Sequence, residues 1–123
     1  METTFFHKNL DQKEIGKFNK YVETKTDMIE NLLTKFAEDA KVLKISIQKF
    51  EKHDAYEVEL RLNLPGKVLV AKEASHQITK AVDLSKDRLM SQIKKHVAHL
   101  RKARSLDSVR GSQPSKMAAA YTA

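Results

Sequence analysis

Two stretches in which apolar and polar residues strictly alternate constrain the fold of this chain more than any other feature. Leu43, Ile45 and Ile47 alternate with polar residues, and the same alternation runs from Tyr56 to Leu64. A period of two places successive side chains on opposite faces of a β-strand. Each stretch therefore predicts a strand with one buried face and one face that is open to solvent or to a ligand.

The segments that follow these strands favour tight turns. Residues 52–54 separate the two alternating stretches, and Pro65 and Gly66 follow the second one. Proline fixes φ and glycine accepts a positive φ, as a tight turn requires. Residues 68–71, with the sequence Val-Leu-Val-Ala, predict a third strand, so the three strands are expected to form an antiparallel meander.

Apolar residues spaced three and four apart predict a helix on either side of this meander. The first spans residues 11–37, and the second runs from the expected N-cap Ser75 to about Arg104. The first packing stripe contains Ile15, Phe18, Val22, Ile29, Leu32, Leu33 and Phe36, and the second contains Ile78, Val82, Leu89, Ile93, Val97 and Leu100. Lys25 and Thr26 interrupt the first stripe, and Ser85 is the polar gap in the second.

A short apolar run at residues 3–10 predicts an opening strand, with Asn9 and Asp11 as candidate caps of the first helix. The expected order is β-α-β-β-β-α, an α+β two-layer sandwich with both helices packed on one face of the sheet. At 123 residues, the chain is long enough for one hydrophobic core. We expect residues 1–104 to form one domain, and residues 105–123, which lack a sustained apolar period, to form a flexible tail.

Almost all of the net charge of +7 lies in the second predicted helix. Residues 1–74 contain 13 basic and 13 acidic residues, whereas residues 75–104 contain 8 basic and 2 acidic ones. A basic stripe on one helix favours contact with a phosphate backbone, and RNA in helical form is recognised through its shape, phosphates and sugar hydroxyls. The expected RNA-binding residues of this helix are Lys80, Lys86, Arg88, Lys94, Lys95, Arg101 and Lys102.

The aromatic residues Phe5, Phe6, Phe50 and Tyr56 offer a second possible contact with RNA, through stacking on bases. Tyr56 is in phase with the apolar residues of its strand, so we interpret it as a core residue. Phe50 is out of phase with its strand, which predicts a surface or bulge position.

Several other classes of function lack support in the sequence. The chain has no cysteine and only three glycines, and it contains no Gly-rich phosphate loop, nucleophile elbow or HExxH motif. Asp83 and Asp87 are explained by the positive end of the helix dipole without acid–base chemistry. His96 and His99 are interpreted as RNA-contacting or solvated residues, not as metal ligands. We expect no enzymatic activity, cofactor or metal, and, without a signal peptide or membrane span, a cytoplasmic protein.

These motifs occur in an order that resembles the ribosome hibernation-promoting factors, also called ribosome-associated inhibitors or ribosomal subunit interface proteins. The resemblance covers residues 3–102, and its strongest parts are Leu64-Pro65-Gly66, Ala81-Val82-Asp83, Asp87-Arg88-Leu89 and Gln92-Ile93-Lys94-Lys95. It implies a fold similar to a double-stranded RNA-binding domain. It also implies binding between the head and body of the small ribosomal subunit, where the bound protein occupies the messenger and transfer RNA sites and represses translation.

The same resemblance places RNA contacts at Arg88, Lys94 and Lys95 of the last helix and at Lys25 of the first. Here the sequence departs from the family pattern at Ser91, a position that is usually basic, and at Thr79, a position that is often aromatic.

The resemblance implies that the partners are the small ribosomal subunit and the intact ribosome, bound through ribosomal RNA during the stress response. We expect no partner among DNA or membranes. The segment after residue 104 is too short for the C-terminal dimerisation domain of the longer family members, so a short form is expected. Two alternatives stay open: a double-stranded RNA-binding module that acts away from the ribosome, and an adaptor whose basic helix binds an acidic protein.

Overall fold

The computed structural model describes residues 1–109, with side chains through Lys102, and its order of elements confirms the predicted β-α-β-β-β-α arrangement. The strands are β1 (Glu2–Lys8), β2 (Val42–Phe50), β3 (Ala55–Leu64) and β4 (Lys67–Ser75). The helices are α1 (Gln12–Asn31) and α2 (Ile78–Val109), and two short 3-10 helices, η1 (Glu38–Ala40) and η2 (Glu51–His53), flank β2. The chain divides into a first unit, Met1–Ile93, and a second unit that begins at Lys94 within α2.

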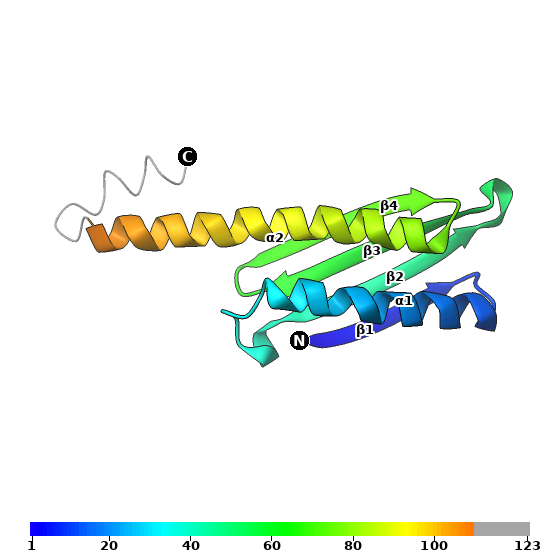
Figure 1. Ribbon diagram of the computed structural model, residues 1–123, viewed down its shortest axis with the longest axis horizontal. Coiled ribbons are helices and arrows are strands. Elements are labelled where there is room, and N and C mark those ends of the chain that lie inside the picture. Colours follow the sequence, from blue (N-terminus) through cyan, green and yellow to red (C-terminus); the bar gives the residue numbers. More distant parts are fainter. Residues whose placement is uncertain (110–123) are drawn as a thin grey trace. The chain divides into compact units, whose positions relative to one another are not determined.

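The four strands form one mixed sheet in the order β1-β2-β3-β4. β1 is parallel to β2, because α1 carries the chain back along the sheet, and the other pairs are antiparallel, which confirms the predicted meander. Gly66 has a φ of 74° in the turn between β3 and β4, as a Pro-Gly turn requires. In the first unit, α1 and the start of α2 lie on the same face of the sheet (Figure 1).

The hydrophobic core fills the space between this face of the sheet and the two helices. Its main residues are Phe18, Val22 and Ile29 of α1, Leu43, Ile45 and Ile47 of β2, Val58, Leu60 and Leu62 of β3, and Ile78, Val82, Leu89 and Ile93 of α2, all of which are buried. Ser85 is also buried, and its hydroxyl lies 2.8 Å from the carbonyl oxygen of Ala81 and 3.0 Å from that of Val82. The polar gap in the stripe is therefore satisfied within its own helix.

A capping box fixes the start of α1 and confirms Asp11 as its N-cap. The Asp11 carboxylate accepts a hydrogen bond from the backbone N–H of Glu14 at 2.7 Å, and the Glu14 carboxylate accepts one from the backbone N–H of Asp11 at 3.1 Å. Asn9 is not the cap. It turns the chain out of β1 with a φ of 64°, a conformation that asparagine tolerates better than most residues.

The ends of both helices differ from the prediction. α1 ends at Asn31 and not near residue 37, because the N–H groups of Leu32 and Leu33 bond to carbonyls three residues back and tighten the chain into a turn. Ser75 ends β4 and is not the N-cap of α2, although its hydroxyl accepts a hydrogen bond from the N–H of Gln77. α2 continues to Val109, and the remainder of the predicted tail, residues 110–123, lies outside the described residues.

Two further predictions are corrected by the burial of individual side chains. Leu100, predicted in the packing stripe of α2, is 37% exposed, and Val97 is only partly buried. Tyr56 is only partly buried, because its hydroxyl extends to the carboxylate of Glu14 at the start of α1.

Glu14 links α1 to the sheet and makes the stability of the fold depend on pH. It accepts the hydrogen bond from Tyr56, and one of its carboxylate oxygens lies 3.2 Å from the Nζ of Lys49. The hydrogen bond from Tyr56, the one from the Asp11 backbone and the charge of Lys49 hold the pKa of Glu14 below its usual value. A carboxyl group with a lowered folded-state pKa stabilises the fold above its unfolded pKa, and this contribution is lost as the pH falls through the folded pKa.

We expect Glu14→Gln to lower the free energy of unfolding at pH 7 by about 1–2 kcal/mol, because it removes the charged partner of Tyr56 and Lys49. The difference from the native protein should shrink as the pH falls below about 4. Urea denaturation at several pH values measures both effects, with the exposed Glu51→Gln as a control. An effect of Glu14→Gln that is the same at pH 7 and pH 3 would contradict this role.

Candidate nucleic-acid interface

Five of the predicted RNA-binding residues on α2 have side chains that are available to a ligand. Lys80, in the first unit, is exposed, and so are the four predicted cations of the second unit, which are Lys94, Lys95, Arg101 and Lys102. Within the described part of the chain, none of these five forms an ion pair or a side-chain hydrogen bond. We call them the free cations. A phosphate group can bind them without first displacing a protein carboxylate.

The other three predicted residues already have acidic partners. The Nζ of Lys86 lies 2.8 Å from Asp87, and this lysine side chain is only 12% exposed. The guanidinium of Arg88 lies 2.9 Å from Glu73 on β4 and is 58% exposed. The third of these residues is Lys25. We call Lys86, Arg88 and Lys25 the paired cations, because RNA must compete with a protein carboxylate for each of them.

Lys25 belongs to a polar cluster that joins the two helices. Its Nζ lies 3.7 Å from an Asp83 carboxylate oxygen and 4.8 Å from the centre of the Tyr21 ring, and its side chain is 24% exposed. The Tyr21 hydroxyl donates to the same carboxylate, 2.8 Å from each oxygen. This hydrogen bond to Asp83 and partial burial raise the pKa of Tyr21. Asp83 thus holds α1 and α2 together and orients Lys25.

The cluster corrects the sequence-based explanation of Asp83. The first turn of α2 contains no acidic residue, so the helix dipole does not account for this carboxylate. Sequence reasoning did not single out Tyr21, and the only available signal was its position four residues before Lys25, which puts the two side chains on one face of a helix.

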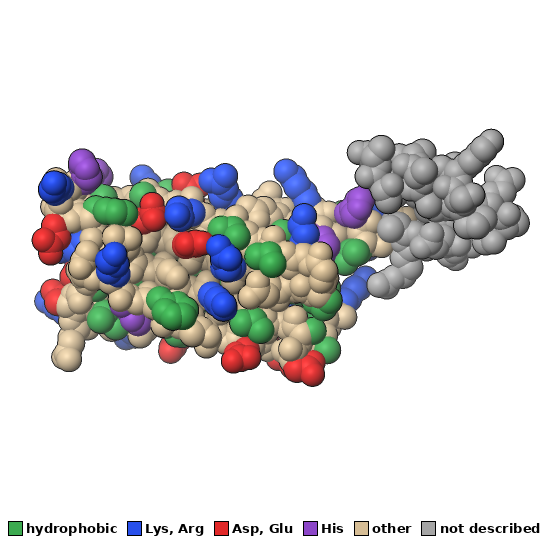
Figure 2. Space-filling model, turned by 180° about the vertical axis from the view of Figure 1, so that it is seen from behind, with side chains coloured by type: hydrophobic (Ala, Val, Ile, Leu, Met, Phe, Trp, Pro, Cys, Tyr) green, Lys and Arg blue, Asp and Glu red, His purple; other side chains and the backbone are tan. Residues whose placement is uncertain are grey.

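The face of the sheet that the helices leave open carries charges of both signs, as Figure 2 shows. Arg61 pairs with Glu59 at 3.6 Å, and Lys72 pairs with Glu57 at 3.7 Å. Phe6, Val68 and Val70 are exposed hydrophobic residues of the sheet. The excess of positive charge thus lies on α2 and not on the open face of the sheet.

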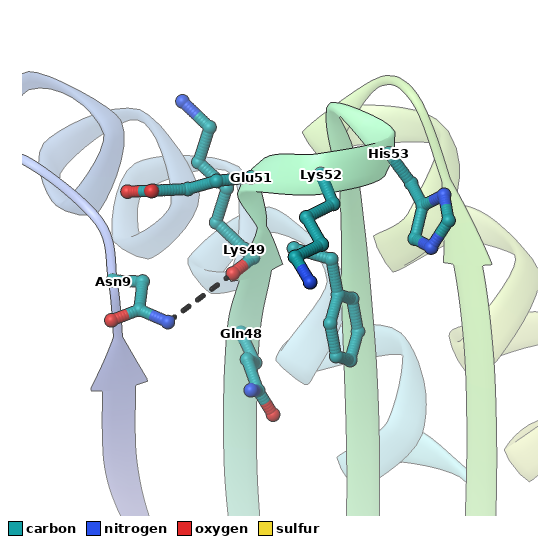
Figure 3. Close-up of a pocket in the computed structure, with 7 residues that line it drawn as sticks. Asn9, Gln48, Lys49, Glu51, Lys52 and His53 are labelled. Atoms are coloured by element: carbon teal, nitrogen blue, oxygen red, sulfur yellow. Dashed lines mark hydrogen bonds between the residues drawn. The ribbon is translucent and has the colours of Figure 1, made fainter.

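A hollow lies between the end of β1 and the connection from β2 to β3 (Figure 3). It is lined by Asn9, Gln48, Lys49, Phe50, Glu51, Lys52 and His53. The Nδ2 of Asn9 donates to the carbonyl oxygen of Lys49 at 3.4 Å and so joins the two segments. Phe50 is partly exposed here, in agreement with its predicted surface position. The hollow contains no free cation of α2, so it is not part of the candidate interface.

Among the side chains described in residues 1–102, no three His, Asp or Glu residues come close enough together to hold a metal ion. In residues 1–109, neither helix has an apolar stretch of the length and hydropathy needed to cross a bilayer.

Comparison with known proteins gives the family. A sequence model described as "Sigma 54 modulation protein / S30EA ribosomal protein" matches residues 10–101, which is most of the chain. This chain belongs to the S30EA ribosomal protein family. Members of the S30EA family are ribosome-associated factors and not enzymes. No curated protein matches the chain.

Two solved structures are similar to this S30EA family member. The N-terminal domain of Protein Y from Thermus thermophilus is 23% identical, with a TM-score of 0.60, and the match covers 78% of this chain and 99% of that one. A ribosomal subunit interface protein from Coxiella burnetii is 20% identical, with a TM-score of 0.55, and the match covers 80% of this chain and 99% of that one. At these identities, the structures confirm the fold.

Proposed function

We propose that this protein is a ribosome hibernation factor of the cytoplasm, one that acts in the stress response. It binds the ribosomal RNA of the small subunit with α2, occupies the sites of messenger and transfer RNA, and represses translation without any chemical reaction. The observation that carries the proposal is the set of free cations on α2, in a chain of the S30EA family whose first 74 residues have no net charge.

The electrostatics of the two sets of cations support this mechanism. Phosphates that bind the free cations release condensed counterions, so the affinity falls steeply as salt rises. Binding to a paired cation also breaks a protein ion pair, which reduces the net gain. The free cations therefore supply most of the affinity for RNA. The paired cations help to orient the protein on the RNA and to match its shape.

Sedimentation of the full chain with isolated ribosomal subunits and intact ribosomes tests the proposal. We expect co-migration with the small subunit and the intact ribosome at low salt, and progressive release as the salt concentration rises. Addition of messenger and initiator transfer RNA should reduce binding if they share the site. Binding to plain RNA duplexes that is as tight as binding to the small subunit would favour a free-RNA module and contradict the proposal.

Asp83 should limit the affinity for RNA, since it holds Lys25 and lies at the candidate interface. We expect Asp83→Asn to tighten binding to the small subunit about threefold at low salt, because the amide keeps a hydrogen-bond acceptor for Tyr21 but releases Lys25 for a phosphate. Titration of labelled small subunits measures the change. Asp39→Asn, an exposed residue in η1, makes the same change in net charge and is the control. Equal effects of the two variants would show that only net charge matters.

A further inference from the structure

β1 is an edge strand with one side unpaired. Among the described residues it pairs with β2 and with no other strand, and Figure 1 shows it in dark blue at the border of the sheet. The N–H of Glu2 donates to the carbonyl oxygen of Lys41, so Glu2, Thr4, Phe6 and Lys8 direct their backbone groups toward β2. The backbone groups of the residues between them, Thr3, Phe5 and His7, consequently point away from the sheet. A row of free donors and acceptors of this kind is a template for pairing with another strand.

Along this edge, the exposed side chains of β1 include one large apolar residue and two charged residues. Phe6, near the middle of the strand, is 52% exposed on the open face of the sheet. Glu2 and Lys8, at the two ends of the strand, are exposed and lie on that same face. Within the described residues, neither side chain has an ion-pair partner. The edge therefore exposes a large aromatic residue between two unpaired opposite charges.

We propose that two copies of this protein associate through antiparallel pairing of their β1 strands. If the two-fold axis passes through Phe5, Glu2 of each copy lies opposite Lys8 of the other, and Thr4 lies opposite Phe6. The residues with outward backbone groups then face one another, Thr3 opposite the second His7 and Phe5 opposite the second Phe5, so the hydrogen-bonding pattern of an antiparallel ladder is satisfied.

The positions of the charged residues favour this antiparallel register over parallel pairing and over shifted registers. Antiparallel pairing in full register forms two Glu2–Lys8 cross-strand pairs, which favour association. Parallel pairing would instead place Glu2 opposite Glu2 and Lys8 opposite Lys8. A shift of two residues in the antiparallel register would leave both Glu2 and Lys8 of each strand without their oppositely charged partners. The isologous contact is also closed, because the β1 edge of each copy is occupied by the other copy and no open chain of copies results through this edge.

Pairing of this kind is expected to be weak. The contact consists of one short strand from each copy, so we expect a dissociation constant on the order of 0.1 mM. β4 lies at the other edge of the sheet and is not used. The association is independent of the proposed RNA-binding surface, because it uses no cation of α2.

Sedimentation equilibrium of the full chain, from about 10 µM to about 1 mM at low salt, tests the proposal. Glu2→Lys and Lys8→Glu each place like charges opposite one another at both ends of the contact, and each should weaken association by about tenfold. An equimolar mixture of the two variants should regain association, because the heterodimer has opposite charges at both ends. Lys13→Glu, an exposed residue of α1, makes the same charge change as Lys8→Glu and should leave association unchanged.

A backbone variant provides a second measurement. Thr3→Pro removes an N–H that points away from β2, so it should abolish association and leave the β1–β2 ladder intact. Thermal unfolding of each variant at low concentration confirms that it is folded. The proposal is overturned if the native chain sediments as a monomer at 1 mM, or if the mixture of charge variants associates no better than either variant alone.

Discussion

Reversing the charges of Lys94 and Lys95 together is expected to reduce the affinity for the small ribosomal subunit about 100-fold at low salt. Both lysines are exposed, and within the described residues neither has an ion pair that would compensate for its loss. The double variant Lys94→Glu/Lys95→Glu removes two phosphate contacts and introduces repulsion at both positions. In titrations at several salt concentrations, the plot of log affinity against log salt should become less steep by about two.

A matched variant separates this local effect from net charge. Lys44→Glu/Lys52→Glu makes the same change in charge at two exposed lysines, on the open face of the sheet and in η2. We expect it to weaken binding by less than about threefold, through long-range electrostatics alone. If both double variants lose affinity equally, the protein is attracted to RNA by its overall charge. If neither loses affinity, α2 is not the surface that binds the ribosome.

Replacing Phe18 with alanine should have the largest effect on stability of any single change considered for this protein. Phe18 projects from α1 into the core and is fully buried, and the ring of His7 packs against it edge-on at 5.8 Å between centroids. The truncation removes buried apolar surface and leaves a cavity, so we expect the free energy of unfolding to fall by about 3–5 kcal/mol. Urea denaturation followed by circular dichroism measures this change.

Phe6 provides the control, since Phe6→Ala makes the same chemical change at a side chain on the open face of the sheet. At low protein concentration, we expect it to cost less than about 1 kcal/mol. Similar losses in the free energy of unfolding for the two variants would mean that Phe18 of α1 is not packed against the sheet. Loss of the native spectrum in Phe18→Ala before any urea is added would place the stability of the native protein below the cost of this cavity.

The sheet could be predicted from sequence because its pattern is local. Leu43, Ile45 and Ile47 alternate with polar residues, and the structure buries all three. The Pro65-Gly66 turn fixes the pairing of the strands on either side of it, since Leu64 lies opposite Lys67. The Asp11 cap depends only on a residue three positions away, so it too could be found from the sequence.

The partners of the cations could not be predicted in the same way. Arg88 of α2 pairs with Glu73 of β4, and Lys25 of α1 pairs with Asp83 of α2. Which residues form these ion pairs depends on how the helices and strands pack together. Counting the charges along one helix does not reveal this packing. The spacing of apolar residues also predicted too long a helix at the end of α1. Leu33 lies beyond the helix but is buried, because the turn directs its side chain into the core, so its spacing resembles that of a helical residue.

The parallel pairing of β1 with β2 has a consequence for the order in which the chain folds. β2, β3 and β4 pair across short turns, so their ladders close small loops, whereas Glu2 must find Val42 across the whole of α1. Contacts that close small loops form sooner than distant ones. We therefore expect the antiparallel meander to form before β1 docks onto it.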